Sequence, residues 1–211
     1  MARINSLYDA VIAGNRKSAV QMVEQNLNVG FDPTDLLEQT MIPAMKEVGF
    51  RFSRGEIYVP EMLIAARAMQ AGLDLLEPIL ARTGARTQAK VAIGTVKGDL
   101  HDIGKNLVAI MLKGAGFEVE DLGVDCAVEK FASAVDRGFT TLCLSALLTT
   151  TMPSMKSVVE RFRDRPDVKI VVGGAPVTRE FAQEIGADAF GEDANEAVQI
   201  VERLLVPEKQ S

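Results

Sequence analysis

His101 is the only histidine in this chain of 211 residues, and Asp99 precedes it by two positions. A carboxylate can accept a hydrogen bond from one imidazole nitrogen, which fixes the tautomer and leaves the other nitrogen free to bind a metal. Gly98 and Gly104 flank the pair, and glycine allows both sharp turns and the close approach of a large group. An isolated histidine near a helix start is more often a capping or surface residue, but these neighbours favour metal binding.

The donors available elsewhere restrict the kind of metal site. Cys126 and Cys143 are too few and too far apart for a disulfide framework or a thiolate cluster, and Cys143 lies in an apolar run where burial is expected. A zinc site of ordinary type would therefore lack ligands. A metal that arrives already chelated needs only one protein nitrogen, so haem and a corrinoid are both candidates.

Two further groups of residues could line such a site. Four hydroxyl side chains lie within the seven residues from Ser145 to Thr151, which is more than the capping of one helix requires. Farther along, Gly173 and Gly174 would open a slot beside a strand end, although glycine pairs are also common in ordinary tight turns.

The elements that position these residues follow from hydrophobic periodicity. From Lys90 onward, short apolar runs rich in β-branched residues alternate with helical segments, which predicts an α/β domain. We predict strands at Val91–Thr95, Phe117–Asp121, Thr141–Ser145, Lys169–Val172 and Ala187–Phe190. The predicted helices are Ile103–Ala115, Val128–Arg137, Met155–Phe162, Arg179–Ile185 and Ala194–Leu205.

Five such units fit a flavodoxin-like, Rossmann-type parallel sheet with strand order 2-1-3-4-5. In that order, the ligand crevice opens at the carboxyl ends of strands one and three. The His101 segment follows strand one and the hydroxyl group follows strand three. The two are therefore expected to face the same crevice.

The first 88 residues have helical periodicity and predict a four-helix bundle, and residues 89–211 form the second predicted domain. The polar segment Ala81–Lys90 is interpreted as a linker, and Pro43 is expected to kink the third helix. The predicted helical segments are Ile4–Val11, Ala19–Leu27, Leu36–Val48 and Met62–Leu80.

Charge and hydropathy exclude several classes of partner. The net charge is −6, which leaves no basic surplus to neutralise phosphates, so we expect no nucleic-acid partner. No stretch approaches the roughly 20 apolar residues of a membrane span, and the N-terminus has no signal-peptide pattern. We therefore expect a cytoplasmic protein with no membrane partner.

Three motifs in order carry a family resemblance: Asp99-x-His101-x-x-Gly104, Ser145-x-Leu147, and Gly173-Gly174. Together they resemble the cobalamin-binding region of methionine synthase. With a helical domain ahead of them, nearly the whole chain is similar to the small corrinoid proteins of methanogenic and acetogenic methyltransferase systems. The resemblance implies a cobalamin or related corrinoid as cofactor, with cobalt as its metal.

The resemblance also implies roles for single residues. His101 would bind cobalt from below in place of the cofactor's own base, and Asp99 and Thr151 would complete a hydrogen-bonded relay. Ser145 and Thr149 would line the slot for the released nucleotide tail, Leu147 would form its wall, Gly173 and Gly174 would make room for the tail, and Asp193 in the last loop would contact its far end. The cofactor would also be bound by the remaining residues of the histidine motif: Gly98, Asp102, Ile103 and Gly104. From the helical domain, Tyr58 and Met62 would cap the upper cobalt face.

By the same resemblance, the chain would be a methyl carrier and not itself an enzyme. Cobalt would accept a methyl group as Co(I) from a substrate-specific methyltransferase and pass it on as methyl-Co(III) to an acceptor methyltransferase, with a reductive activation protein as a further partner. The substrates of such systems are methylamines, methanol, betaines and methoxylated aromatics. The helical cap would swing aside on the 81–90 linker.

Other functions of this architecture fit less well. A cobalamin-dependent sensor would need a DNA-binding module ahead of the bundle, and we expect no room for one. The small subunit of a corrinoid mutase usually lacks the N-terminal bundle. A phospho-receiver would need an aspartate where Ser145 lies, and a flavodoxin would need more aromatic residues than two tyrosines and no tryptophan.

Overall fold

The computed structural model describes residues 4–83 and 88–205, except for the side chains of 81–83 and 88. It divides into two compact units. One consists of Met1–Gln88 with Ile110–Phe117, and the other of Ala89–Ala109 with Glu118–Ser211. In the described part of the chain, no helix is long and apolar enough to cross a lipid bilayer.

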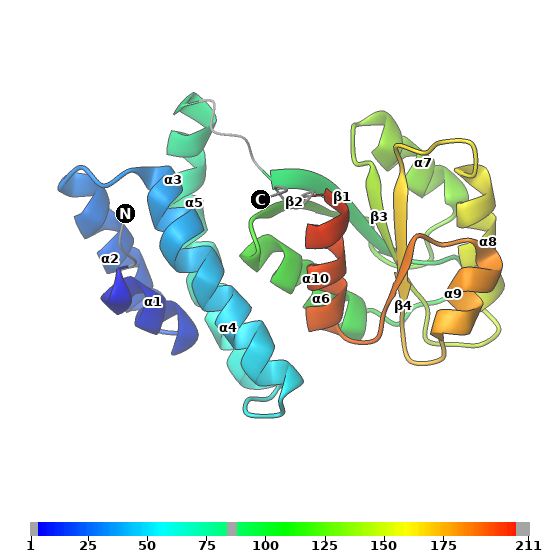
Figure 1. Ribbon diagram of the computed structural model, residues 1–211, viewed down its shortest axis with the longest axis horizontal. Helices are drawn as coiled ribbons and strands as arrows, with labels where there is room; N and C mark the ends of the chain where they lie inside the picture. The colour runs from blue at the N-terminus through cyan, green and yellow to red at the C-terminus, as the bar shows by residue number, and fades with distance from the viewer. Residues whose placement is uncertain (1–3, 84–87, 206–211) are drawn as a thin grey trace, which may run out of the picture. The chain divides into compact units, whose positions relative to one another are not determined.

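The first unit contains the predicted helical bundle (Figure 1). Asn15 begins one helix by accepting a hydrogen bond from the Ser18 amide (3.0 Å), and Asp32 caps the next with Pro33 in its first turn. Leu7, Val11 and Val23 lie in the apolar interior. The helices are α1 (Asn5–Ile12), α2 (Arg16–Asn28), α3 (Pro33–Leu36), α4 (Ile42–Ser53) and α5 (Val59–Thr83).

The third predicted helix contains an irregular turn. Between α3 and α4, Leu37–Met41 forms a π-helical turn, η1, in which the Ile42 amide donates to the Leu37 carbonyl. Pro43 follows immediately; it has no amide hydrogen, and its ring crowds the preceding turn. A wider turn ahead of the proline makes room for that ring. The irregularity expected at Pro43 is thus a π turn just before it.

The second unit is the predicted α/β fold (Figure 1). Its parallel strands lie in the order β2-β1-β3-β4-β5, which confirms the predicted topology. The strands are β1 (Gln88–Thr95), β2 (Phe117–Asp121), β3 (Thr141–Ser145), β4 (Lys169–Gly173) and β5 (Ala189–Gly191). The helices are α6 (Ile103–Gly114), α7 (Val128–Asp136), α8 (Met152–Arg161), α9 (Arg179–Ile185) and α10 (Ala194–Leu205).

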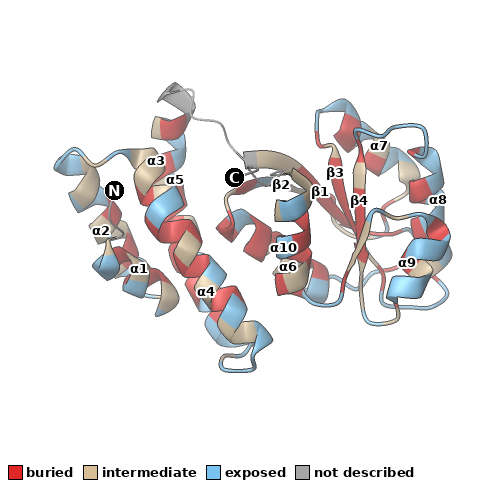
Figure 2. Ribbon diagram, in the orientation of Figure 1, coloured by how far each residue is buried: buried red, intermediate tan, exposed pale blue. Residues whose placement is uncertain are grey.

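Both faces of the sheet are buried, as parallel sheets require (Figure 2). On one face, Leu142 and Leu144 of β3 pack into a core with side chains of α7, α8 and α9, including Phe131 and Met155. Figure 1 shows α6 and α10 on the other face. Cys143, also in β3, is buried, as expected.

The predicted linker is shorter than its composition suggested. Its first three residues, 81–83, belong to the end of α5, and 88–90 belong to the start of β1. Residues 84–87 lie outside the described residues. Regular structure on both sides therefore extends into the segment that polarity alone marked as a linker.

Candidate cofactor site

The predicted site residues of the α/β unit lie at or just after the carboxyl ends of the strands. In the sheet register Thr95 pairs with Ser145, Ser145 with Gly173, and Gly173 with Gly191. The His101 loop continues from the first of these positions, and the hydroxyl-rich loop from the second. Two segments almost fifty residues apart in sequence, such as Asp99 and Leu147 with a separation of 48, meet at this edge.

His101 is held at one nitrogen and exposed at the other side of its ring. Its Nδ1 lies 2.7 Å from Asp99 Oδ1, and its backbone amide donates to the same oxygen (3.1 Å). The Thr95 hydroxyl donates to the His101 carbonyl (2.9 Å). Because the carboxylate accepts the Nδ1 hydrogen, Nε2 retains its lone pair. The side chain is 51% exposed, so that lone pair is available to a ligand outside the protein.

Asp99 is fully buried, and its second oxygen also has partners. Oδ2 accepts hydrogen bonds from the amides of Leu147 (2.7 Å) and Leu148 (3.2 Å) and from the Thr151 hydroxyl (2.7 Å). Burial raises the pKa of this carboxyl, but the hydrogen bonds from Leu147, His101 and Thr151 outweigh it and hold the pKa well below its usual range. Asp99 is therefore ionised, the state that accepts the imidazole hydrogen.

Thr151 has a position usually used for capping, but its hydroxyl contacts Asp99. It is the N-cap residue of α8, yet its side chain makes no cap hydrogen bond. The hydroxyl lies 2.7 Å from Asp99 Oδ2 and 2.8 Å from the Leu148 carbonyl. Since a hydroxyl has one hydrogen and an ionised carboxylate is the stronger acceptor, we assign the donation to Asp99. The methyl group of threonine does not prevent this contact.

The two loops that meet at Asp99 also have exposed apolar side chains. Leu100 and Ile103 are 72% and 82% exposed, and Leu147 and Leu148 are both more than 40% exposed. Exposed large apolar groups on the same loops as an exposed imidazole are typical of a surface that a ligand covers. A flat apolar macrocycle with its own chelated metal would cover these side chains and need only the one nitrogen.

Gly104 adds to this interpretation. A Cβ at this position would meet no atom within 4 Å, and the residue lies in the first turn of α6 with ordinary helical geometry. Nothing in the protein itself requires glycine there, whereas a closely approaching ligand would. Gly98 differs, because its φ of +85° is a conformation that favours glycine.

Gly173 and Gly174 are close to other parts of the backbone. A Cβ at Gly174 would lie 1.9 Å from the Ala146 carbonyl oxygen, and one at Gly173 would lie 2.9 Å from that of Gly191. The expected empty space at their Cβ positions is therefore occupied by the protein itself. A role for this pair in accommodating a nucleotide tail stays a prediction.

The other predicted residues lie at varied positions. Ser145 is half-buried and Thr149 exposed, and the exposed Asp102 accepts from Asn106 Nδ2 (3.1 Å). Asp193 caps α10 through the Glu196 amide (2.8 Å). In the helical unit, Tyr58 is 70% exposed whereas Met62 has no exposed surface. Met62 is thus a core residue here, and a cofactor contact would require it to move.

Sequence reasoning missed three contributors to the site. The Leu148 amide and the exposed side chain of Leu100 carry no motif, because a backbone donor and the degree of exposure cannot be read from residue types. Asp125 was also missed; its carboxylate accepts from the Gly98 amide (2.7 Å). The signal available for Asp125 was its place in a polar turn after a predicted strand.

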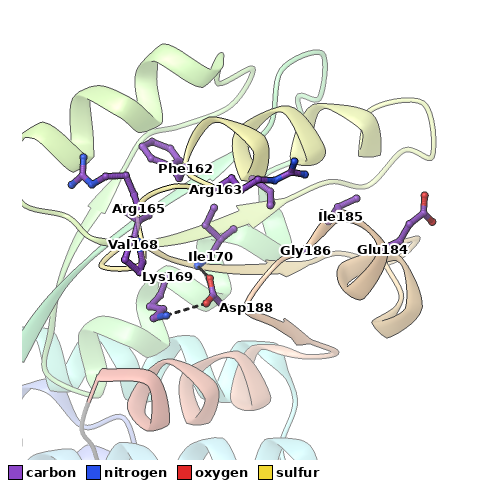
Figure 3. A pocket seen from close by; sticks show the side chains of 12 residues that line it. Phe162, Arg163, Arg165, Val168, Lys169, Ile170, Glu184, Ile185, Gly186 and Asp188 are labelled. Carbon is purple, nitrogen blue, oxygen red and sulfur yellow. Dashed lines mark hydrogen bonds and ion pairs between the residues drawn. The ribbon is translucent and has the colours of Figure 1, made fainter.

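A cavity of about 230 Å³ at the opposite end of the sheet is separate from this site (Figure 3). It lies at the amino end of β4, where Lys169 pairs with Asp188 (3.2 Å).

Within residues 4–83 and 88–205, no group of three or more His, Cys, Asp or Glu side chains could hold a metal ion. At the His101 edge, one exposed imidazole nitrogen is the donor that a metal already held by its own chelator would need.

Comparison with known proteins decides which macrocycle fits. Two family models, both described as B12 binding domains, match residues 89–201 and 3–77. The chain belongs to the B12-binding family of corrinoid proteins. Its cofactor is a corrinoid, which removes haem from the two candidates.

Relatives of this B12-binding protein match over most of their length. It is 39% identical to dimethylamine corrinoid protein 1 of Methanosarcina acetivorans, over 90% of this chain and 92% of that protein. It is 42% identical to trimethylamine corrinoid protein 2 of Methanosarcina mazei, over 89% and 88%.

Solved structures have the same fold. A cobalamin-binding protein from Desulfitobacterium hafniense DCB-2 is similar with a TM-score of 0.78 and 32% identity, over 94% of this chain and 97% of that one. The methanol:cobalamin methyltransferase complex MtaBC from Methanosarcina barkeri matches with a TM-score of 0.84 and 28% identity, over 96% of this chain and 79% of that one.

Proposed function

We propose that this protein is a methyl carrier that works between two methyltransferases, one specific for a methylated substrate and one for the acceptor. The observation that carries the proposal is the Thr151–Asp99–His101 chain, which ends in an exposed imidazole on loops that also have exposed apolar side chains. When bound, a corrinoid would supply a cobalt that takes up a methyl group from one enzyme and yields it to another.

The protein's own part in this function is to adjust how strongly His101, the proposed lower ligand of cobalt, donates to the metal. Asp99 fixes the Nδ1 hydrogen of His101 and shares negative charge with the ring, which makes Nε2 a stronger donor. The Thr151 hydroxyl withdraws part of that charge. A change at either hydrogen bond would thus strengthen or weaken the imidazole as a ligand.

The relatives support methylamines as the substrate class. Proteins named for dimethylamine and trimethylamine match at 39% and 42% identity, whereas the methanol system matches at 28%. By analogy with the MtaBC complex, we propose direct docking to a separate methyltransferase. A reductive activation protein completes the proposed set of partners, because cobalt that has been oxidised outside the methyl-transfer cycle would have to be reduced again to Co(I).

We also propose that residues 1–88 form a cap domain over the upper face of the cofactor and that 89–211 bind it, with movement at the connection between them. The separate matches to residues 3–77 and 89–201 support this division. Exposed Tyr58 is the candidate capping side chain.

The single histidine allows a direct test of the lower ligand. Apo-protein grown with ¹⁵N-histidine is loaded with aquocobalamin, reduced to cobalt(II), and studied by electron paramagnetic resonance. A nitrogen ligand from His101 splits the cobalt lines into doublets, whereas the cofactor's own ¹⁴N base gives triplets. We expect doublets; triplets would contradict the assignment. His101→Ala should still bind some corrinoid, but without the histidine-ligated spectrum and with most methyl transfer lost.

Carrier function is tested with the loaded, reduced wild-type protein. It is mixed with a methyltransferase specific for dimethylamine, trimethylamine or methanol and its substrate. We expect methylation of the corrinoid with a methylamine. Methylation with methanol alone would contradict the proposed substrate class, and methylation with none of the three would count against carrier function in these systems.

A further inference from the structure

The His101 loop is tied to a second segment of the chain that no motif marks. This segment, Asp121–Cys126, begins at the last residue of β2 and is called the brace below. Backbone hydrogen bonds join it to the end of β1 and to the loop: the Thr95 amide donates to Gly123, the Cys126 amide to Thr95, and the Asp125 amide to Asp99 (2.9–3.0 Å).

Two side chains of the brace hold the loop on either side of the histidine. Asp125 Oδ1 accepts from the amide of Gly98, three residues before His101, at 2.7 Å. Asp121 accepts from Lys105 Nζ, four residues after His101, at 2.5 and 2.6 Å. The Lys105 side chain is 2% exposed; its charge is paired with Asp121 of the brace, and it also donates a hydrogen bond to the neighbouring Asn106 Oδ1.

Asp125 adopts an uncommon backbone conformation to make this contact. Its φ is +49°, and among the described residues no other non-glycine has a positive φ. Aspartate and asparagine tolerate this region better than other residues with a Cβ, at some cost in free energy. Strained residues of this kind concentrate at functional sites. Here the strained residue directs a carboxylate at the flexible glycine before the metal-binding histidine.

We propose that Asp125 is a positioning residue for His101. By fixing the Gly98 amide, it holds the loop in the conformation in which Asp99 can engage Nδ1 and Nε2 remains exposed. Gly98 has a φ of +85° and would otherwise sample many conformations. The inference rests on the proposed function, since positioning matters to the extent that His101 binds cobalt.

Three substitutions at Asp125 distinguish the effect of losing the carboxylate acceptor from the effect of changing the backbone conformation. Asp125→Asn keeps an oxygen acceptor and tolerates the positive φ. Asp125→Gly removes the acceptor but also removes the strain, so the fold is preserved. Asp125→Ala removes the acceptor and keeps the strain. Asp164→Gly, at an exposed position between α8 and β4, is the matched control for loss of one charge.

Two measurements are made on each full-length variant. In the apo-protein, NMR of ¹⁵N-labelled His101 reports the fraction of the ring that has its hydrogen on Nδ1. In protein loaded with aquocobalamin and reduced to cobalt(II), the doublet and triplet spectra report how much cobalt is bound by His101. Thermal unfolding of the apo-protein shows whether each variant is folded.

We expect Asp125→Asn and Asp164→Gly to match wild type. Asp125→Gly should unfold no more easily than wild type, yet lower the ratio of histidine-bound to histidine-free cobalt by on the order of tenfold, the usual effect of losing a hydrogen bond to a charged acceptor. If folded Asp125→Gly has the same doublets and the same tautomer as wild type, the positioning role of Asp125 is wrong, while the proposed function is unaffected. Triplets in wild type would overturn the proposed function together with that role.

Discussion

At the scale of single residues, the site depends on a carboxylate that is buried and yet ionised. Asp99 accepts five hydrogen bonds, from three backbone amides, one hydroxyl and one imidazole. This number of donors compensates for its removal from water. A consequence is that loop 147–151 and the His101 loop are joined through one side chain, so a change in either affects the other.

Replacing Thr151 tests the contribution of its hydroxyl. Thr151→Val keeps the shape but leaves a buried carboxylate with one donor fewer, so we expect a loss of about 1.5–3 kcal/mol in the free energy of unfolding of the apo-protein. Thr151→Ser keeps the hydroxyl and should lose less. Urea unfolding of both variants provides the measurement, and equal stabilities would show that the hydroxyl contributes nothing to Asp99.

Cys143 gives a stability that depends on pH. Complete burial raises the pKa of its thiol to about 12, whereas in the unfolded chain a thiol ionises near 8.5. Above that pH the unfolded state gains by losing the proton and the folded state does not, so stability falls as pH rises. We expect wild type to lose up to about 1.4 kcal/mol per pH unit more than Cys143→Ala between pH 9 and 11. Parallel curves in urea unfolding would contradict this.

At the scale of helices and strands, a substitution at Gly104 is expected to have opposite effects on the stability of the apo-protein and on its affinity for the cofactor. Gly104→Ala introduces a methyl group where the protein has space, and alanine favours helix, so the apo-protein should gain up to about 1 kcal/mol. If the corrinoid packs against this turn, the same methyl should weaken aquocobalamin binding by about tenfold or more. Thermal unfolding and absorbance titration measure the two effects. An affinity equal to that of wild type would show that the cofactor does not approach Gly104.

The sequence predicted the strands and helices well, because buried parallel strands are apolar runs with distinct ends. The predicted bounds of β2, β3, α9 and α10 agree with the structure. The errors have local causes: α8 begins at Met152, ahead of the predicted start, because Pro153 is tolerated in a first turn. The π turn at Leu37–Met41 depends on the geometry of hydrogen bonds, which residue types do not reveal.

The candidate site was predictable where a side chain contributes its own chemistry and not where the backbone does. Asp99, His101 and Thr151 were identified because a carboxylate, an imidazole and a hydroxyl have known partners. The amides of Leu147 and Leu148 were not, and neither was the positive φ of Asp125. The Gly173-Gly174 pair was found, but its Cβ positions turned out to be taken by carbonyl groups of the protein.

At the scale of the whole protein, the proposed cap can be tested through its exposed tyrosine. We expect Tyr58→Ala to speed the loss of the methyl group when the full-length protein is loaded with methylcobalamin and illuminated, because the methyl radical that light releases would escape more easily before it recombines with cobalt. Val29→Ala, at an equally exposed apolar residue of the same helical unit, should match wild type. Absorbance during illumination follows the reaction, and equal rates in all three proteins would exclude Tyr58 from the cap.

The scarcity of donors around His101 also bears on how the protein avoids the wrong metal. The whole sequence has one histidine, and its two cysteines are buried. Free zinc, copper or nickel ions need several protein ligands to bind tightly, and in the described part of the chain no such group of side chains exists. A metal that brings its own ligands, as the cobalt of a corrinoid does, would need from the protein only the one nitrogen that His101 can supply.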